Sequence, residues 1–227
     1  MKLNYRTISF IEGILAWTLF VIIGSFLAGL SPSHFLEKIM IITLVGGVLF
    51  FSGWKIFCER ESSFRNFLKR IAINLNLNFE VKSEFYPEYE LKGKYDGLTL
   101  LIRVWRRGIY GGGVVWYKIR TLLSLPKTLF LEITPNYFRS KTLTGNKEFD
   151  KKFSVKTNDE KKILKFLTQD IQKKLIRFRE LGWFELKLRN SELVFHHGMV
   201  LSSFEREFKV ILENVIQIAR KLMSIKT

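Results

Sequence analysis

Two long apolar stretches stand near the start of the chain and are separated by only four residues. They run from Ile8 to Leu30 and from Phe35 to Phe57, with Ser31–His34 between them. A bilayer core of about 30 Å is crossed by about 20 apolar residues in a helix. A helix also satisfies its own backbone hydrogen bonds where no water is present. The pattern predicts a two-helix transmembrane hairpin over residues 1–58.

A secretory signal peptide is the alternative interpretation of residues 1–30, because Lys2 and Arg6 give a basic start. The apolar core of a signal peptide is about 7–15 residues long. The first stretch is longer than that, and a second stretch follows almost at once. An uncleaved membrane anchor is therefore favoured.

Basic residues predict how the hairpin would be oriented. Few flank the connection Ser31–His34, whereas several follow the second stretch, and cytoplasmic loops carry the excess of Lys and Arg. We therefore expect an inner-membrane protein with two spans and both termini in the cytoplasm. The basic residues expected at the membrane surface are Arg60, Arg65, Lys69 and Arg70.

Two further features of the hairpin leave alternatives open. Glu12 falls inside the first stretch, and it is either a carboxylate that reaches the headgroups or a proton or ion site. Its shallow position favours the first interpretation. Gly46, Gly47 and Gly53 permit close helix contacts, which serve packing within the hairpin or homo-oligomers formed through it.

Residues 59–227 are long enough for one domain with its own core, and they are strongly basic. They carry 33 of the 37 Lys and Arg residues and 19 of the 21 Asp and Glu residues. Such a domain is attracted to anionic lipid, nucleic acid or an anionic small ligand. Cys58 is the single cysteine, which excludes an intramolecular disulfide and suits a reducing cytoplasm.

Sequence periodicity predicts an α+β fold, with a mainly antiparallel sheet and two long helices, for this basic cytoplasmic domain. A shorter amphipathic helix is expected first, from Glu61 to Leu77. The long helices are expected from Thr157 to Gly182 and from Ser202 onwards, each with a capping-box start. The segment 135–152 is expected to be a mobile loop. Strands are expected at 89–95, 98–105, 114–122, 128–134, 153–156, 183–189 and 192–201.

The search for chemistry yields one candidate site. Arg103, Arg106 and Arg107 flank a glycine-rich hairpin tip, and guanidinium groups suit phosphate or carboxylate, so an anionic ligand is expected there. His196 and His197 are adjacent on an expected strand and point to opposite faces, which does not suit a shared metal. No metal, cofactor or catalytic residue is predicted, and the domain is expected not to be an enzyme.

Aromatic residues among basic strands suggest a further class of partner. Trp105, Tyr110, Trp116 and Tyr117 follow a pattern that single-stranded nucleic-acid binders use. Alternate aromatic residues on strands more often belong to a core, and tethered nucleic-acid binders are uncommon. Nucleic acid is therefore not the expected partner.

Two motifs resemble a known group of proteins. The segment Thr144–Val155 reads T-G-x-x-x-F-D-x-x-F-x-V, and Leu91–Gly97 contains a G-x-Y-x-G hairpin. This order resembles uncharacterised bacterial two-span membrane proteins with a cytoplasmic domain of unknown function. The resemblance implies that Phe149 and Phe153 anchor a loop to the core and that Asp150 caps it. It implies no activity.

The layout is also similar to membrane effectors of bacterial cyclic-nucleotide defence systems, in which a nucleotide binds a β-rich domain and the spans breach the membrane. Taken together, we expect an integral membrane protein whose cytoplasmic domain binds a protein partner or an anionic ligand at the bilayer surface. A ligand-gated membrane effector and an enzyme acting on a membrane-bound substrate are the two alternatives.

Overall fold

The computed structural model describes residues 14, 17–19, 32–83, 87–107, 113–136 and 144–225. The chain divides into two compact units. The first is Met1–Phe67 with Ser83–Tyr86, and the second is Leu68–Lys82 with Pro87–Thr227. The second unit, called the sheet domain below, holds all the strands that the structure pairs in register.

The predicted transmembrane hairpin is wrong. In the part of the chain that the structure describes, no helix has the length and apolarity needed to cross a bilayer. The second apolar stretch belongs to α2 (Pro32–Asn74), a helix of 43 residues. This helix does not end after Phe57 but continues through Glu59, Arg60 and Glu61, so apolar and charged turns share one element. The inner-membrane localisation with two spans and cytoplasmic termini is corrected with it.

The other residues predicted for the hairpin lie partly outside the described part of the chain. Most of the first stretch, Ile8–Leu30, lies outside the described residues, and so does Glu12. Of the expected basic helix, Glu61–Asn74 is the last part of α2. The four residues assigned to a membrane surface are exposed on that helix: Arg60, Arg65, Lys69 and Arg70.

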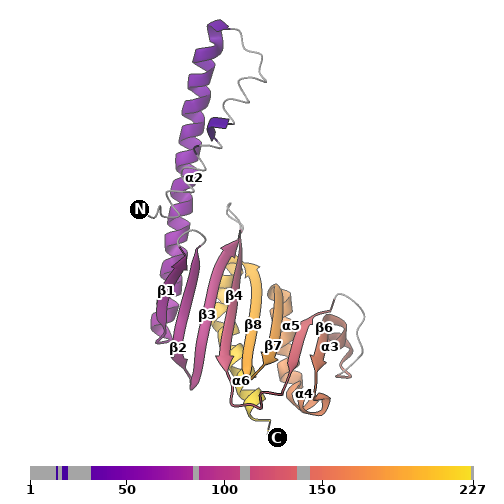
Figure 1. The fold of residues 1–227 in the computed structure, drawn as a ribbon. Helices are drawn as coiled ribbons and strands as arrows, with labels where there is room; N and C mark the ends of the chain where they lie inside the picture. The colour runs from indigo at the N-terminus through magenta and orange to yellow at the C-terminus, as the bar shows by residue number, and fades with distance from the viewer. Residues whose placement is uncertain are drawn as a thin grey trace. The chain divides into compact units, whose positions relative to one another are not determined.

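The predicted α+β class with an antiparallel sheet holds for the sheet domain. Eight strands form one sheet in the order β1-β2-β3-β4-β8-β7-β5-β6 (Figure 1). Every pair whose register is given is antiparallel. The strands are β1 (Asn78–Ser83), β2 (Glu88–Tyr95), β3 (Leu98–Arg107), β4 (Val114–Leu122), β5 (Leu131–Pro135), β6 (Phe153–Thr157), β7 (Trp183–Arg189) and β8 (Glu192–Val200).

Turn chemistry explains the two tightest hairpins. Asp96 and Gly97 both have positive φ, at 55° and 80°, as a two-residue hairpin turn requires. Asn190 and Ser191, in the turn between β7 and β8, also have positive φ, at 50° and 64°. Between these hairpins the chain crosses to the far edge of the sheet for β5 and β6. It then returns, so β8 pairs with β4 in the middle.

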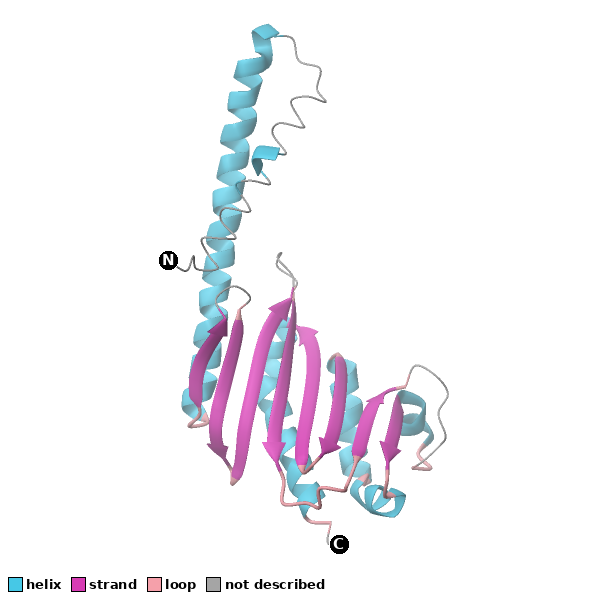
Figure 2. Ribbon diagram, in the orientation of Figure 1, coloured by secondary structure: helices cyan, strands magenta, loops and turns pink. Residues whose placement is uncertain are grey.

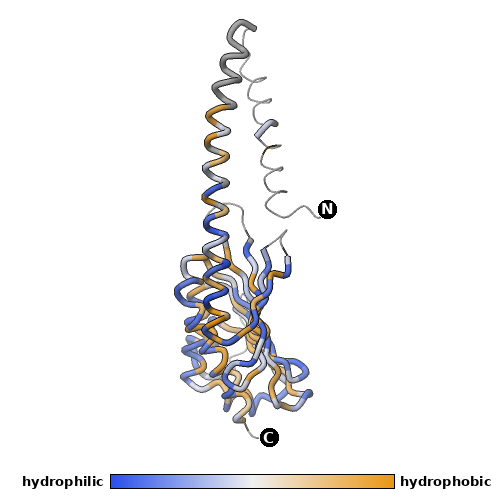
Figure 3. The backbone as a smooth tube through the Cα atoms, turned by 90° about the vertical axis from the view of Figure 1, so that its left-hand side faces the viewer, coloured by the Kyte–Doolittle hydropathy of each residue, from blue (hydrophilic) through white to orange (hydrophobic). Residues whose placement is uncertain are grey.

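Helices cover one face of the sheet. α5 (Gln169–Leu181) packs on β7, and α6 (Leu201–Met223) packs on β4 and β8 (Figure 2). One side of α6 is buried, and it consists of Phe204, Phe208, Leu212, Val215, Ala219 and Leu222. Figure 3 shows apolar and polar residues interspersed along the sheet domain. Successive residues of a strand point to opposite faces, so the apolar ones can share the buried face.

The sequence prediction misses β1 and begins β5 at 128 rather than at Leu131. The other differences concern helices. The expected helix from Thr157 is two helices, α4 (Glu160–Phe166) and α5. Gln172 is buried at this break, and its amide donates to the carbonyl of Leu167 at 2.7 Å. α4 is capped by Asp159 rather than Thr157, and α6 has no side-chain cap. A short helix, α3 (Lys147–Lys152), occupies part of the expected mobile loop.

Candidate functional site

Strand alternation gives the sheet two different faces. Along β4, Val115, Tyr117 and Ile119 are buried, whereas Trp116 and Lys118 are partly exposed. β7 and β8 follow the same pattern. The described helices lie behind the central strands in Figure 1, so the partly exposed residues point to the other side. The side of β3, β4, β8 and β7 that the described helices leave uncovered is called the open face.

Aromatic side chains form a row across the open face. Trp105 on β3 is opposite Trp116 on β4, Trp116 is opposite Gly198 on β8, and Gly198 is opposite Trp183 on β7. The His196 ring contacts all three indoles, with centroid distances of 5.5 Å to Trp105, 5.4 Å to Trp116 and 5.0 Å to Trp183. Trp116 and Trp183 also lie 5.5 Å apart. These four residues are the tryptophan–histidine cluster.

Gly198 lets this cluster close. A Cβ atom at this position would lie 2.8 Å from Cε3 and Cζ3 of Trp116, closer than atoms in contact normally approach. The missing side chain therefore allows the Trp116 indole to lie across β8, where it reaches both Trp183 and His196. Glycine is needed at this position for the space that its missing side chain leaves, not for its conformational freedom.

Replacing Gly198 with alanine should displace the Trp116 ring while the sheet stays folded. The obstacle is a side chain that can turn away, so we expect a cost of about 1 kcal/mol in folding free energy. Intrinsic tryptophan fluorescence should shift to longer wavelength as the indole becomes more exposed. An unchanged emission spectrum would contradict the closed arrangement of the cluster.

A charged row lies beside the aromatic row. Arg103, Lys118, His196 and Glu185 are opposite one another on β3, β4, β8 and β7. The Nε atom of Arg103 donates to Glu90 at 3.0 Å, and Glu185 accepts from Lys187 at 2.8 Å. These ion pairs satisfy the two ends of the row.

Lys118, in the middle of the charged row, differs from its neighbours. Its cross-strand neighbours are Arg103 and His196, and no carboxylate of the described residues forms an ion pair with it. Like charges directly opposite each other on a sheet are unfavourable. The middle of the row therefore carries positive charge that the described part of the protein leaves unbalanced.

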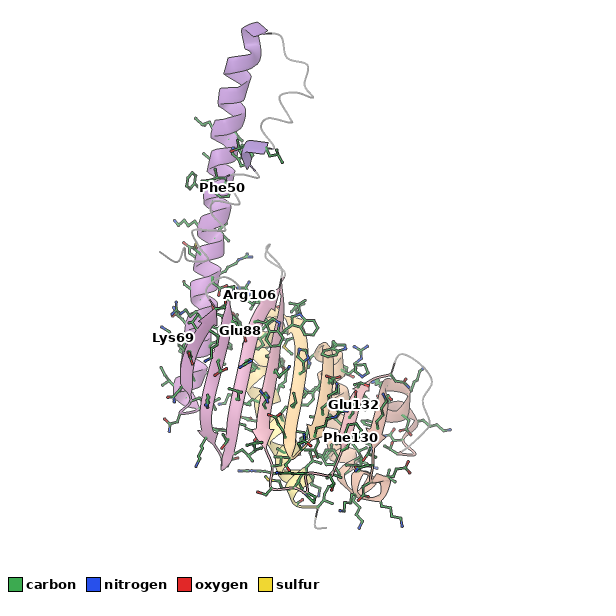
Figure 4. The ribbon with its side chains drawn as sticks, viewed as in Figure 1. Phe50, Lys69, Glu88, Arg106, Phe130 and Glu132 are labelled. Carbon is green, nitrogen blue, oxygen red and sulfur yellow. The ribbon has the colours of Figure 1, made fainter. Side chains whose placement is uncertain are left out.

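The three arginines expected to hold an anion do not share a face. Arg103 lies on the open face, two residues from Trp105. Arg106 is opposite Val115, whose side chain is fully buried, so alternation places it on the other side of the sheet. Figure 4 shows Arg106 at the same end of the sheet as Glu88. The side chain of Arg107 lies outside the described residues.

The adjacent histidines point to opposite faces, as the sequence predicts. His197 is fully buried under the helices, and its Nε2 lies 2.9 Å from the carbonyl oxygen of Phe178. Burial lowers the pKa of His197 to about 4. Burial also raises the pKa of Tyr117, whose ring lies 5.4 Å from that of His197. Both groups are neutral at pH 7 and are closed off from any ligand on the open face.

The described part of the chain offers no candidate metal site. The described residues contain no group of three or more His, Cys, Asp or Glu side chains that could hold a metal ion. The backbone of His34 lies in α2, and its side chain is outside the described residues.

Residues 144–153 form an ordered structural motif. Asp150 accepts from the backbone N–H and the hydroxyl of Thr144, at 3.2 and 2.9 Å, and so closes the loop. Asn146 caps α3 and donates to Gln172 at 2.6 Å. Phe149 and Phe153 are buried with ring centroids 4.7 Å apart. These residues therefore anchor the loop, as the motif implied, and they do not line the open face.

Comparison with known proteins identifies no family. No protein-family model matches the chain, and no curated protein matches it. Among solved structures, the chain is similar to the mycobacterial trehalose monomycolate transport factor A, TtfA, with a TM-score of 0.49 and 10% sequence identity. The match covers 72% of this chain and 96% of that one. A likeness of this strength says nothing about the function of this chain.

Sequence reasoning found part of the cluster and missed the rest. The sequence pattern of aromatic residues on basic strands includes Trp105 and Trp116, but it also includes Tyr117, which is core, and Tyr110, which is outside the described residues. Trp183 was not connected to them. The pairing of β4 with β8 brings the tryptophans together, and no local sequence pattern predicts that pairing.

Proposed function

We propose that the sheet domain is a binding domain, not an enzyme, and that it holds an anionic ligand on the open face over the tryptophan–histidine cluster. The observation that carries this proposal is the position of Lys118. It lies beside two further basic groups, next to the aromatic row, with no carboxylate partner among the described residues.

The residues that gather on the open face supply binding energy. Indole rings offer broad flat surfaces, and Arg and Lys supply charge and hydrogen-bond donors. The formal charge of the chain, +16 at pH 7, draws anions toward it before contact. A protein partner would use the same surface through its own carboxylates or phosphates. The membrane effector required the spans, and the enzyme on a membrane-bound substrate required a pocket with clustered polar groups; neither is proposed.

Reversing the charge of Lys118 tests this proposal. We expect the full chain to bind sodium polyphosphate and Lys118→Glu to weaken binding by about tenfold, which corresponds to the loss of one charged contact. Titration calorimetry at fixed salt measures the affinity, because charge-driven binding depends on ionic strength.

Lys209→Glu is the matched control. Lys209 is exposed on α6, on the helix-covered side, and its substitution changes the net charge by the same amount. Binding to this variant should stay within about twofold of the unmodified chain. Equal losses in both variants would show that only overall charge matters and would refute the site on the open face.

A further inference from the structure

We propose that the ligand of the open face is a single-stranded nucleic acid, whose bases stack on the indoles of Trp105, Trp116 and Trp183 while its phosphates lie along Arg103 and Lys118. This inference rests on the proposed function and names its ligand class. It departs from the expectation drawn from sequence, because the structure brings together tryptophans that the sequence leaves on separate strands.

The tryptophans are arranged to receive more than one base. They stand on β3, β4 and β7, which with β8 make four adjacent strands. Neighbouring strands are about 4.8 Å apart, so the row spans about 14 Å. A single base covers only part of such a row, whereas successive bases of one strand can cover all of it. The three indoles remain partly exposed, as a stacking surface requires.

The charged row lies where the phosphates of stacked bases would be. Lys118 is two residues from Trp116 on β4, and Arg103 is two residues from Trp105 on β3. Two residues of strand correspond to about 7 Å, and both pairs point to the same face. Trp105 and Trp116 thus each have a cation beside them within reach of a phosphate on the stacked nucleotide, whereas the residue in that position beside Trp183 is Glu185, whose carboxylate pairs with Lys187.

This arrangement selects single strands over duplexes. In a duplex the base faces are stacked on each other and closed to indoles, whereas unpaired bases offer a π-face that any aromatic ring can meet. His196, beside the aromatic row on the same face, contacts all three indoles. Because stacking does not read base edges, little sequence preference is expected.

Fluorescence anisotropy of a labelled oligonucleotide tests the inference with the full chain. The probe is a single-stranded oligothymidylate of about 12 nucleotides, a length within the usual site size of such binders. The comparison ligands are a duplex of equal length, thymidine monophosphate, polyphosphate, and phosphatidylcholine vesicles containing phosphatidylglycerol. We expect the single strand to bind most tightly and to quench tryptophan fluorescence.

Substitution of the rings separates stacking from charge. Trp116→Ala should weaken single-strand binding by roughly tenfold or more, while Trp116→Phe, which keeps a ring, retains most of it. Trp105→Ala, at the other end of the row, repeats the test at a site away from Gly198. Polyphosphate has no bases to stack, so its binding should fall by less than single-strand binding in the two alanine variants. An unchanged far-ultraviolet circular dichroism spectrum would show that all three variants are folded.

The outcomes distinguish this inference from the proposed function. If polyphosphate, the duplex, the mononucleotide or the vesicles bind as tightly as the single strand, or if the alanine variants keep full affinity for it, the inference is overturned. Polyphosphate binding that depends on Lys118 would then still support the open-face site. If no anion binds, both proposals fail.

Discussion

Lowering the pH from 7 to 4 should cost the sheet domain about 3 kcal/mol of folding free energy through one side chain, His197. Burial lowers the pKa of this histidine from 6.5 to about 4 in the folded protein. Between these two values the unfolded chain binds a proton that the folded chain does not. Stability is therefore complete above pH 6.5 and falls as the pH drops toward 4, by about 1.4 kcal/mol per pKa unit.

The structural cause is the position of His197 in the core. It packs against Tyr117, Phe184 and Phe195, with ring centroids 5.4 to 6.4 Å away, and its Nε2 meets the carbonyl oxygen of Phe178. The hydrogen bond opposes the shift and the neighbouring His196 adds to it, but loss of hydration is the largest effect. Protonation would place a charge among aromatic rings.

Urea unfolding of the full chain at a series of pH values measures this effect. Carboxylates also titrate in this range, so the informative quantity is the difference between variants. His197→Gln should be less stable at pH 7 but lose less stability on acidification. His196→Gln, one residue away on the open face, should keep most of the slope. If the His197 variant keeps the full slope, the assignment of acid sensitivity to this residue is refuted.

Replacing Gly182 with alanine should destabilise the sheet domain by about 3 kcal/mol, at the upper end of the usual cost of overpacking. Gly182 ends α5 and has a φ of +159°. A Cβ atom there would lie 2.0 Å from the carbonyl oxygen of Gly198. The obstacle is backbone in the centre of the sheet, so no side-chain rotation relieves it and α5 or β8 must move.

The same substitution should also disturb the open face, because Gly198 and Trp183 belong to the aromatic row. Gly97→Ala is the matched control. Gly97 has a φ of +80° in the β2–β3 turn, and a Cβ atom there meets nothing within 4 Å. This control should cost only about 1–2 kcal/mol, the usual penalty of left-handed backbone for alanine. Chemical denaturation compares the two, and a smaller loss for Gly182→Ala would contradict the close approach to β8.

Local physics explains which parts of the fold could be predicted. Alternating hydrophobic residues predict β4 and β7 at their observed bounds. Turn residues mark two hairpins, Asp96-Gly97 between β2 and β3 and Asn190-Ser191 between β7 and β8. Alternation also showed that His196 and His197 face opposite sides. These signals depend only on near neighbours in the chain.

Other elements were misjudged because local signals compete. Buried apolar residues recur at helical spacing from Ile163 to Phe178, which favours one helix, but they continue across a break between α4 and α5 that Gln172 stabilises. The apolar run ending at Phe57 predicts a complete span, but the helix continues through the charged residues that follow it. In both cases the apolar pattern is present in the sequence, but it does not show where the helix ends.

By itself, the sequence determined the α+β class of the sheet domain, most of its strands, its basic character and the face on which each strand residue lies. Only the tertiary structure decided that β8 lies between β4 and β7, which brings Trp116 to Trp183 and leaves Lys118 between Arg103 and His196. The physical reason is that alternation and turns act between neighbouring residues. Strand order depends on which strands, distant in sequence, bury their apolar faces best under α5 and α6. No short stretch of sequence shows which of these arrangements is the most stable.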